Sequence, residues 1–211
     1  MRVIEARTTG EAWLDVSRAI LEQGAEAEYD GQATRELALL TVVVAEPASD
    51  DPIVAELADP DWLAWMQDNF GVHGAVPELG GADSYARRLY DYAGTGRDQV
   101  AWVVERLRVD PENRSATITT FQPLTDETYI PCVSMLDFWL PGGVLQLVVY
   151  AHGLDFGKKA YGNLVELSRL QEHVARELGV PVGTLVIHVK SAHVYEPERE
   201  LMARHVAVSR V

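Results

Sequence analysis

The chain has 211 residues, a formal net charge of −14 at pH 7 and a hydrophobic fraction of 47%. A negative field of that size repels nucleic acid polymers, and no apolar run approaches the roughly 18 residues that a membrane span needs. The first residues form no apolar stretch of the signal-peptide type. We therefore expect a cytoplasmic protein with no membrane or nucleic acid partner, folded as a single domain over residues 1–211.

The N-terminal part is predicted to contain a helix, a strand and a loop. Thr8 and Glu11 form a capping box, and apolar residues at helical spacing then continue to about Gln23. The run over 37–45 is apolar and rich in β-branched residues, which is typical of a buried strand. Proline, aspartate and alanine dominate residues 46–60, which indicates a loop with at most one short helix.

Further along the chain, helices alternate with strands around a central hairpin. The predicted elements are a short helix after Asp59, helices over 84–92 and 99–107, a strand over 115–122, strands over 133–140 and 144–151, a helix over 163–178, a strand over 185–195, a helical turn over 196–202 and a short strand over 205–208. Pro141-Gly142-Gly143 predicts a tight turn between the two central strands. The pattern indicates an α+β (mixed α/β) fold, with a mixed β-sheet flanked by helices around one core.

Cysteine and histidine usage narrows the chemistry. Cys132 is the single cysteine, so neither an intrachain disulfide nor a thiolate-rich metal site is possible. The six histidines form no HExxH-like pair, so no metal is expected. A lone cysteine is most often a small buried hydrophobe, whereas a catalytic one needs surroundings that favour its thiolate.

Polar residues around and after this cysteine fall at a distinctive spacing. They are Cys132, Asp155, Asn163, His193 and Tyr195. The stretch over 130–195 resembles the thymidylate synthase and pyrimidine hydroxymethylase family, whose Cys, Asp, Asn and His follow one another at the same intervals. Its IPC and SAHVY segments resemble the family's Pro-Cys nucleophile motif and its Asp-Ala-His-x-Tyr segment. Upstream, Trp62 and Trp65 resemble the family's paired tryptophans, and LRVDPENR, which ends at Arg114, resembles a segment of phosphate-binding arginines.

The resemblance implies a thymidylate-synthase-like fold that pairs sheet to sheet as a homodimer. Cys132 would attack C6 of a small-molecule pyrimidine, so that C5 accepts a one-carbon unit from 5,10-methylenetetrahydrofolate. Asp155 would act beside it as the second catalytic residue. The remaining roles are implied in the same way: Asn163 would recognise a uracil-type base, His193 and Tyr195 the sugar hydroxyl, Arg114 the partner's phosphate, His152 the substrate, and Trp62 and Trp65 the pterin.

Each of these residues also has a plain structural reading. Asn163 would cap the helix that follows it, and Arg114 would be a solvated turn residue. Asp155 would belong to a turn, and the His193–Tyr195 pair to a polar strand end. Paired tryptophans on one helix face more often pack in a core than bind a pterin.

The chain departs from the family pattern at the phosphate site. His152 stands where the family has an arginine, Gly153 where it has a serine, and Ser115 where it has the second cross-subunit arginine. Candidate replacements for phosphate binding are Arg35, Arg87 and Arg88, and candidates for a water-organising glutamate are Glu46 and Glu56. Lys158 and Lys159 either supply positive charge or face solvent. The chain ends at Val211 without the family's folate-closing tail, which favours hydroxymethylation or another acceptor over methyl transfer.

The leading interpretation is therefore an enzyme. It would transfer a one-carbon unit to C5 of a pyrimidine nucleotide or nucleoside-like substrate, in specialised metabolism. The alternative is a non-catalytic, pyrimidine-binding or partner-binding member of the same family. A third interpretation is an unrelated α+β domain whose spacing matches by accident.

Overall fold

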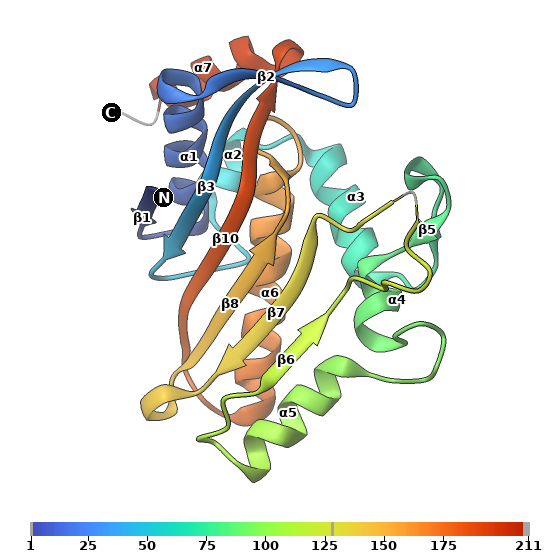
Figure 1. Ribbon diagram of the computed structural model, residues 1–211. Helices are drawn as coiled ribbons and strands as arrows, with labels where there is room; N and C mark the ends of the chain where they lie inside the picture. The colour runs from blue at the N-terminus through green and yellow to red at the C-terminus, as the bar shows by residue number, and fades with distance from the viewer. Residues whose placement is uncertain (1, 128, 209–211) are drawn as a thin grey trace.

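One mixed sheet runs through the molecule, with α1 and α6 behind it in the view of Figure 1. The structure is a computed structural model that describes residues 2–127 and 129–208. The helices are α1 (Thr9–Gln23), α2 (Pro52–Leu57), α3 (Pro60–Gly71), α4 (Tyr85–Tyr90), α5 (Gln99–Val109), α6 (Ala160–Leu178) and α7 (Arg199–Val208), with short 3-10 turns η1 (Pro77–Leu79), η2 (Pro141–Gly143) and η3 (Glu196–Glu198).

The strands form one large sheet and one small one. They are β1 (Arg2–Ala6), β2 (Ala25–Tyr29), β3 (Gln32–Val44), β4 (Ala75–Val76), β5 (Ala82–Asp83), β6 (Ala116–Thr119), β7 (Val133–Trp139), β8 (Leu145–Ala151), β9 (Leu154–Asp155) and β10 (Val182–Tyr195). The large sheet has the order β1-β3-β10-β8-β7-β6, with β2 on β3 and β9 on β10. Strand β10 is antiparallel to β3 and parallel to β8 and β9, so the sheet is mixed as expected.

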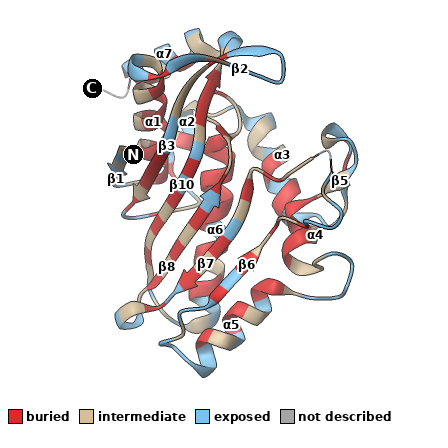
Figure 2. Cartoon of the chain, viewed as in Figure 1, coloured by how far each residue is buried: buried red, intermediate tan, exposed pale blue. Residues whose placement is uncertain are grey.

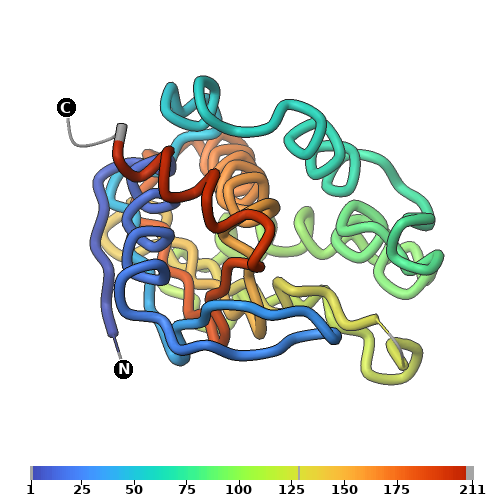
Figure 3. Tube along the Cα trace, turned by 90° about the horizontal axis from the view of Figure 1, so that it is seen from above, coloured from blue at the N-terminus to red at the C-terminus, as the bar shows by residue number. Residues whose placement is uncertain are grey.

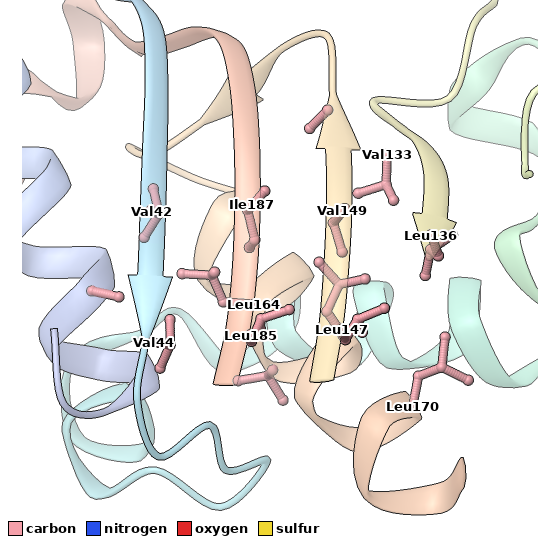
Figure 4. Packing of buried hydrophobic residues seen from close by; sticks show 14 of the residues in the cluster. Val42, Val44, Val133, Leu136, Leu147, Val149, Leu164, Leu170, Leu185 and Ile187 are labelled. Carbon is pink, nitrogen blue, oxygen red and sulfur yellow. The ribbon is translucent and has the colours of Figure 1, made fainter. Parts of the chain in front are cut away.

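Alternation along the strands decides which face of the sheet is covered. Strand β8 reads buried at every second position, and its intervening residues are intermediate or exposed. Figure 2 shows buried residues interspersed with intermediate and exposed ones along the strands, and the sheet packs against α6 and α1. Each fully buried leucine, isoleucine or valine contributes roughly 1.5–3 kcal/mol. Figure 4 shows this packing for Val42, Val44, Val133, Leu136, Leu147, Val149, Leu164, Leu170, Leu185 and Ile187.

Most predicted elements are confirmed. The capping box of Thr8 and Glu11 begins α1. The predicted central hairpin is β7–β8, and its turn needs glycine because Gly142 and Gly143 have φ of 61° and 78°. The region over 46–60 contains only one complete short helix, α2, as predicted.

Several boundaries differ from prediction, among them the start of β10 at Val182 and the end of α4 at Tyr90. The short strand expected over 205–208 is wrong, because α7 continues to Val208 and buries Met202 and Val206, four residues apart on one helical face. The strand expected over 115–122 spans only Ala116–Thr119. Helix α6 begins at Ala160, three residues earlier than expected, because the preceding turn already provides helical backbone bonds.

Helices α3 and α6 meet at a glycine. A Cβ added to Gly162 would lie 2.9 Å from Met66 Cβ, so only glycine allows this approach without a shift. The contact sets the start of α6 directly against α3, the helix that carries Trp62 and Trp65. Within residues 2–127 and 129–208, no helix is long and apolar enough to cross a membrane.

Candidate active site

A cavity of about 430 Å³ opens where β8 and β10 end. Ligands commonly bind beyond the carboxyl ends of parallel strands, because loops diverge there. Seen from this end, the β2–β3 hairpin reaches toward the segment that leads into β7 (Figure 3). Among the sequence-predicted residues, the cavity is lined by Cys132, His152, Asp155, Asn163, His193, Tyr195 and Trp65.

Cys132 is held by backbone hydrogen bonds on both sides. Its carbonyl accepts from the His152 N–H at 3.0 Å, and the Val133 N–H donates to the Tyr85 hydroxyl at 3.0 Å. Burial raises the pKa of the Cys132 thiol, the charge of Lys159 opposes that rise, and the charge of Asp155 adds to it. The backbone that carries the thiol is thus fixed in place, and the balance of nearby charges decides how readily the thiol ionises.

Asp155 pairs with β10 beside His193 in the short strand β9. One carboxylate oxygen accepts from the Gly157 N–H at 3.0 Å. Burial, followed by the charge of Glu198, raises the pKa of Asp155 to about 6, although the Gly157 bond and Lys159 oppose the rise. This carboxyl can therefore hold or release a proton close to neutral pH.

His193 and Tyr195 point to the same side of β10, and their ring centroids are 5.1 Å apart. His193 is buried and also contacts Tyr29, at 5.6 Å between centroids. Burial lowers the pKa of His193, so its imidazole is neutral at pH 7. Burial raises the pKa of Tyr195 to about 12, so its hydroxyl keeps its proton as a hydrogen-bond donor.

Asn163 lies inside the first turn of α6 and is only 3% exposed. The N-cap reading is wrong, because its backbone N–H already bonds to the Lys159 carbonyl and α6 begins earlier. Among the described residues, its side-chain amide donates to Met66 Sδ alone, at 3.5 Å, and a thioether sulfur is a weak acceptor. The amide therefore retains hydrogen-bonding capacity toward the cavity.

The two tryptophans face different spaces. Trp65 lines the cavity with Cys132, whereas Trp62 lines a neighbouring cavity of about 610 Å³. Their rings contact edge to face, 5.5 Å between centroids. The Lys158 ammonium lies 4.7 Å from the centre of the Trp62 ring, and the Lys159 ammonium lies 5.4 Å from Trp62 and 5.6 Å from Trp65.

The cationic groups proposed for a phosphate are not brought to this cavity. Arg114 is exposed before β6, whose start pairs with the far end of β7 from Cys132. His152 does line the cavity, 3.4 Å from the Ser134 hydroxyl, and burial followed by the charge of Lys190 lowers its pKa, so it is neutral at pH 7.

The replacement candidates are also engaged elsewhere. Arg88 is buried in an ion pair with Asp126, Arg87 pairs with Asp83, and the Arg35 side chain donates to the Gly24 carbonyl. The glutamate candidates fail in the same way, since Glu46 pairs with Arg7 at the surface and Glu56 is exposed on α2. Neither supplies a wall of the cavity.

Several cavity residues were missed from the sequence. Tyr29 and Asp30 enter from the β2–β3 turn, where Asp30 and Gly31 have φ of 50° and 72°. An Asp-Gly pair is a strong hairpin signal, so this turn was detectable. Tyr85, Asn69, Glu78 and Tyr129 gave no such signal, because only the tertiary fold brings them to the cavity.

No group of three or more His, Cys, Asp or Glu side chains that could hold a metal ion exists in the part of the chain that the structure describes. The family model described as thymidylate synthase matches residues 50–210. A protein of Methanopyrus kandleri described as "Putative thymidylate synthase" is 31% identical over 204 residues, covering 93% of this chain and 94% of that protein. Proteins of Methanosarcina barkeri and Methanosarcina acetivorans with the same description are 27% and 29% identical, each covering 95% of this chain and 93% of the relative.

Proposed function

Because the chain belongs to the thymidylate synthase family, we propose that it is a transferase that adds a one-carbon unit at C5 of a uracil-type pyrimidine in a small molecule. The observation that carries this proposal is the convergence of Cys132, Asp155, Asn163 and His193 on one cavity. These residues are spread over three strands or strand ends and one helix, so their meeting depends on the fold. A cavity of about 430 Å³ lies within the roughly 300–1,000 Å³ typical of small-molecule sites.

In this mechanism the Cys132 thiolate adds to C6 of the ring. The new S–C6 bond moves the ring electrons onto O4 as an enolate, and C5 becomes nucleophilic. The fixed backbone on both sides of Cys132 would keep the sulfur at one angle to the ring. As the C5–CH2 bond forms and the bond from that carbon to the carrier nitrogen breaks, the electron pair of that bond would go to the nitrogen, and a base would take the C5 proton. Addition of water to the exocyclic methylene, or of a hydride from the reduced carrier, would complete the substituent, and the thiolate would leave with the S–C6 electron pair as the C5=C6 double bond returns.

The polar side chains would orient the ring and handle its protons. The Asn163 amide can donate to O4 and accept from N3–H, which matches a uracil edge. Asp155, with its pKa near 6, is suited to exchange a proton with the substrate side of the cavity. His193 and Tyr195, as neighbours on β10, would hold a sugar hydroxyl.

The proposed carrier is 5,10-methylenetetrahydrofolate, and the cavity contains features that fit its flat ring. The Trp65 indole offers an aromatic wall, and the Asp155 carboxyl offers an acceptor for ring N–H groups. When bound, the carrier supplies a one-carbon unit at the oxidation level of formaldehyde. Trp62, whose ring touches that of Trp65, would extend the wall into the second cavity.

The electrostatics of the cavity bear on the substrate's phosphate. Lys159 is the one lysine or arginine among the described lining residues, beside the carboxyls of Asp30, Glu78 and Asp155. Because one cation faces three carboxyls, the cavity of a single chain favours a nucleoside-like substrate over a nucleotide. This preference supports a role in specialised metabolism. A sheet-to-sheet homodimer, in which Arg114 serves the partner's cavity, would restore one phosphate ligand.

Hydrogen exchange at C5 tests this proposal directly. The protein is incubated in deuterium oxide with uridine, deoxyuridine, their monophosphates and the cytosine counterparts, with and without methylenetetrahydrofolate, beside Cys132→Ala. We expect deuterium at C5 of a uracil substrate and none with the variant. An added carbon identifies the product, because methyl and hydroxymethyl groups differ in mass.

The same panel separates the second candidate function. A folded protein that binds pyrimidines without C5 exchange would be a non-catalytic member, a reading favoured by the absence of arginine among the described lining residues. Sedimentation of the same sample measures the proposed dimer. A fully active monomer would contradict the role given to Arg114.

A further inference from the structure

The geometry points to Lys159 as the positioning residue whose charge promotes the ionisation of Cys132. This inference rests on the proposed function for its meaning, because a thiolate is what attacks the ring. From the sequence alone, the Lys159 side chain could either supply positive charge or face solvent. The structure separates Lys159 from its neighbour Lys158.

Lys159 is the lysine that faces the catalytic cavity. It lines the cavity with Cys132, Asp155 and Asn163, whereas Lys158 lines the second cavity beyond Trp62. The charge of Lys159 lowers the pKa of Cys132, of Asp155 and of His193, in agreement with its place in the lining of the cavity that these residues share. The charge of Lys158 also lowers the pKa of Asp155, but Lys158 lies outside the lining of the cavity that holds Cys132.

Two indole rings hold the Lys159 ammonium in position. It lies 5.4 Å from the ring centre of Trp62 and 5.6 Å from that of Trp65, within the roughly 6 Å of a cation–π contact. Its backbone N–H also donates to the Asp155 carbonyl at 3.0 Å. The side chain therefore leaves a fixed backbone and ends against a fixed aromatic wall, so its charge is preorganised instead of free to swing into solvent.

The other ionisable groups around the thiol cannot replace this charge. The carboxyls that line the cavity repel a thiolate, and His152 and His193 are neutral at pH 7 because burial lowers their pKa. The phenols lining the cavity are protonated, since burial raises the pKa of each: Tyr29, Tyr85, Tyr129 and Tyr195. Lys159 is thus the cation available to Cys132 among the described lining residues.

Alkylation of Cys132 tests the inference without any substrate. Because the chain has one cysteine, intact-mass measurement of iodoacetamide addition reports this thiol alone. The rate is measured from about pH 6 to about pH 11.5, so that a raised midpoint and the plateau fall inside the range, for the wild type, Lys159→Met, Lys159→Arg and the matched control Lys158→Met. We expect Lys159→Met to raise the midpoint by about one pH unit and to slow alkylation at pH 7.5 roughly tenfold, while Lys159→Arg and Lys158→Met stay within about twofold of the wild type.

The profile separates charge from access. The plateau rate at high pH reports how easily the reagent reaches the sulfur, and the midpoint reports its ionisation, so a changed plateau with an unchanged midpoint would overturn the inference. Equal midpoint shifts in Lys158→Met and Lys159→Met would also overturn it, because they would indicate a general field. Lys159→Gln serves in place of Lys159→Met if circular dichroism shows that the latter is unfolded. A midpoint shift without any C5 exchange would support Lys159 and count against the proposed reaction.

Discussion

Two buried polar regions lie within one small part of the molecule, and they use their hydrogen bonds in opposite ways. In the first, which we call the Arg88 cluster, the guanidinium of Arg88 is 2% exposed and donates to the Asp83 carbonyl, the Thr120 carbonyl and both carboxylate oxygens of Asp126, at 2.7–2.9 Å. Gln99 completes it by donating to the Arg88 carbonyl at 2.9 Å. The polar groups of the cluster hydrogen-bond to one another, as buried polar groups with a structural role must.

The cavity that holds Cys132 contains polar groups with few hydrogen-bond partners. Asn163 has only a thioether as side-chain partner, Cys132 is a free thiol, and Asp155 is held with its pKa raised to about 6. Such groups are costly to bury unless a ligand completes their bonds. The difference between the two regions predicts that substitutions in the Arg88 cluster cost stability, while those in the cavity cost activity.

The largest effect on stability is expected for Arg88→Met. Removing the guanidinium takes the counter-charge from the buried Asp126 carboxylate, which then keeps the Gln122 N–H as a donor, and takes a donor from two backbone carbonyls, which together costs about 3–5 kcal/mol. Urea denaturation measures this loss. Arg87→Met is the control, because its ion pair with Asp83 is partly exposed and is worth about 1 kcal/mol or less. A loss below about 1 kcal/mol for Arg88→Met would show that the cluster is not structural.

The next effect has the opposite sign. The pKa of Asp155 is about 6 in the folded protein against 3.8 ordinarily, so ionising it costs folding energy that appears as pH rises through that window and is absent below it. Asp155→Asn should therefore stabilise the protein by roughly 1–3 kcal/mol at about pH 7.5 and far less at about pH 4. C5 exchange should fall at the same time. The measurement is urea denaturation at both pH values, and equal stability of the two proteins at about pH 7.5 would contradict the raised pKa.

Tyr85→Phe tests the boundary between the two regions. Tyr85 lines the cavity, and its hydroxyl accepts from the buried Val133 N–H next to Cys132. The variant leaves that N–H without a partner, at a cost of about 1–2 kcal/mol. Thermal unfolding compares it with Tyr150→Phe, whose ring is 39% exposed on the sheet. If both variants have the same unfolding temperature, the hydroxyl of Tyr85 does not stabilise the backbone next to Cys132.

The smallest stability effect is expected for Asn163→Ala. The lost Met66 contact is weak, and alanine suits a helix better than asparagine, so unfolding should change by less than about 1 kcal/mol. C5 exchange should still fall by roughly tenfold or more, because the ring would lose its paired hydrogen bonds. A variant that exchanges at the wild-type rate would remove Asn163 from the site.

Sequence reasoning found the site residues that lie in one continuous stretch of the chain, residues 130–195. Cys132 and Asp155 follow recognisable local patterns, and His193 with Tyr195 share a face through strand alternation alone. The same reasoning placed Trp62 beside Trp65, yet the fold divides them between two cavities. A helical spacing fixes which residues are neighbours but does not say which space each ring enters.

Features that depend on contacts between distant parts of the chain could not be predicted from local sequence patterns. Strand β1 is five residues long and pairs only with β3, so its pattern gave little signal. The region over 205–208 is rich in valine, and its local preference for strand is overridden by the packing of Met202 and Val206. Lys159 differs from Lys158 only through the tryptophans that surround them, which no local pattern reveals.

The position of β10 in the sheet has a consequence for biosynthesis. Among the described residues, β10 is the last strand in chain order, yet it lies between β3 and β8 and bonds to both. As the chain leaves the ribosome, the edges of β3 and β8 that pair with β10 therefore stay unpaired until residues 182–195 have emerged. The pairing of β10 with β3 then joins segments that are far apart in the sequence. Nascent chains that stall before this point would expose strand edges prone to self-association. The cavity around Cys132 includes residues at the end of β10, so it would form only when β10 has paired with its neighbours.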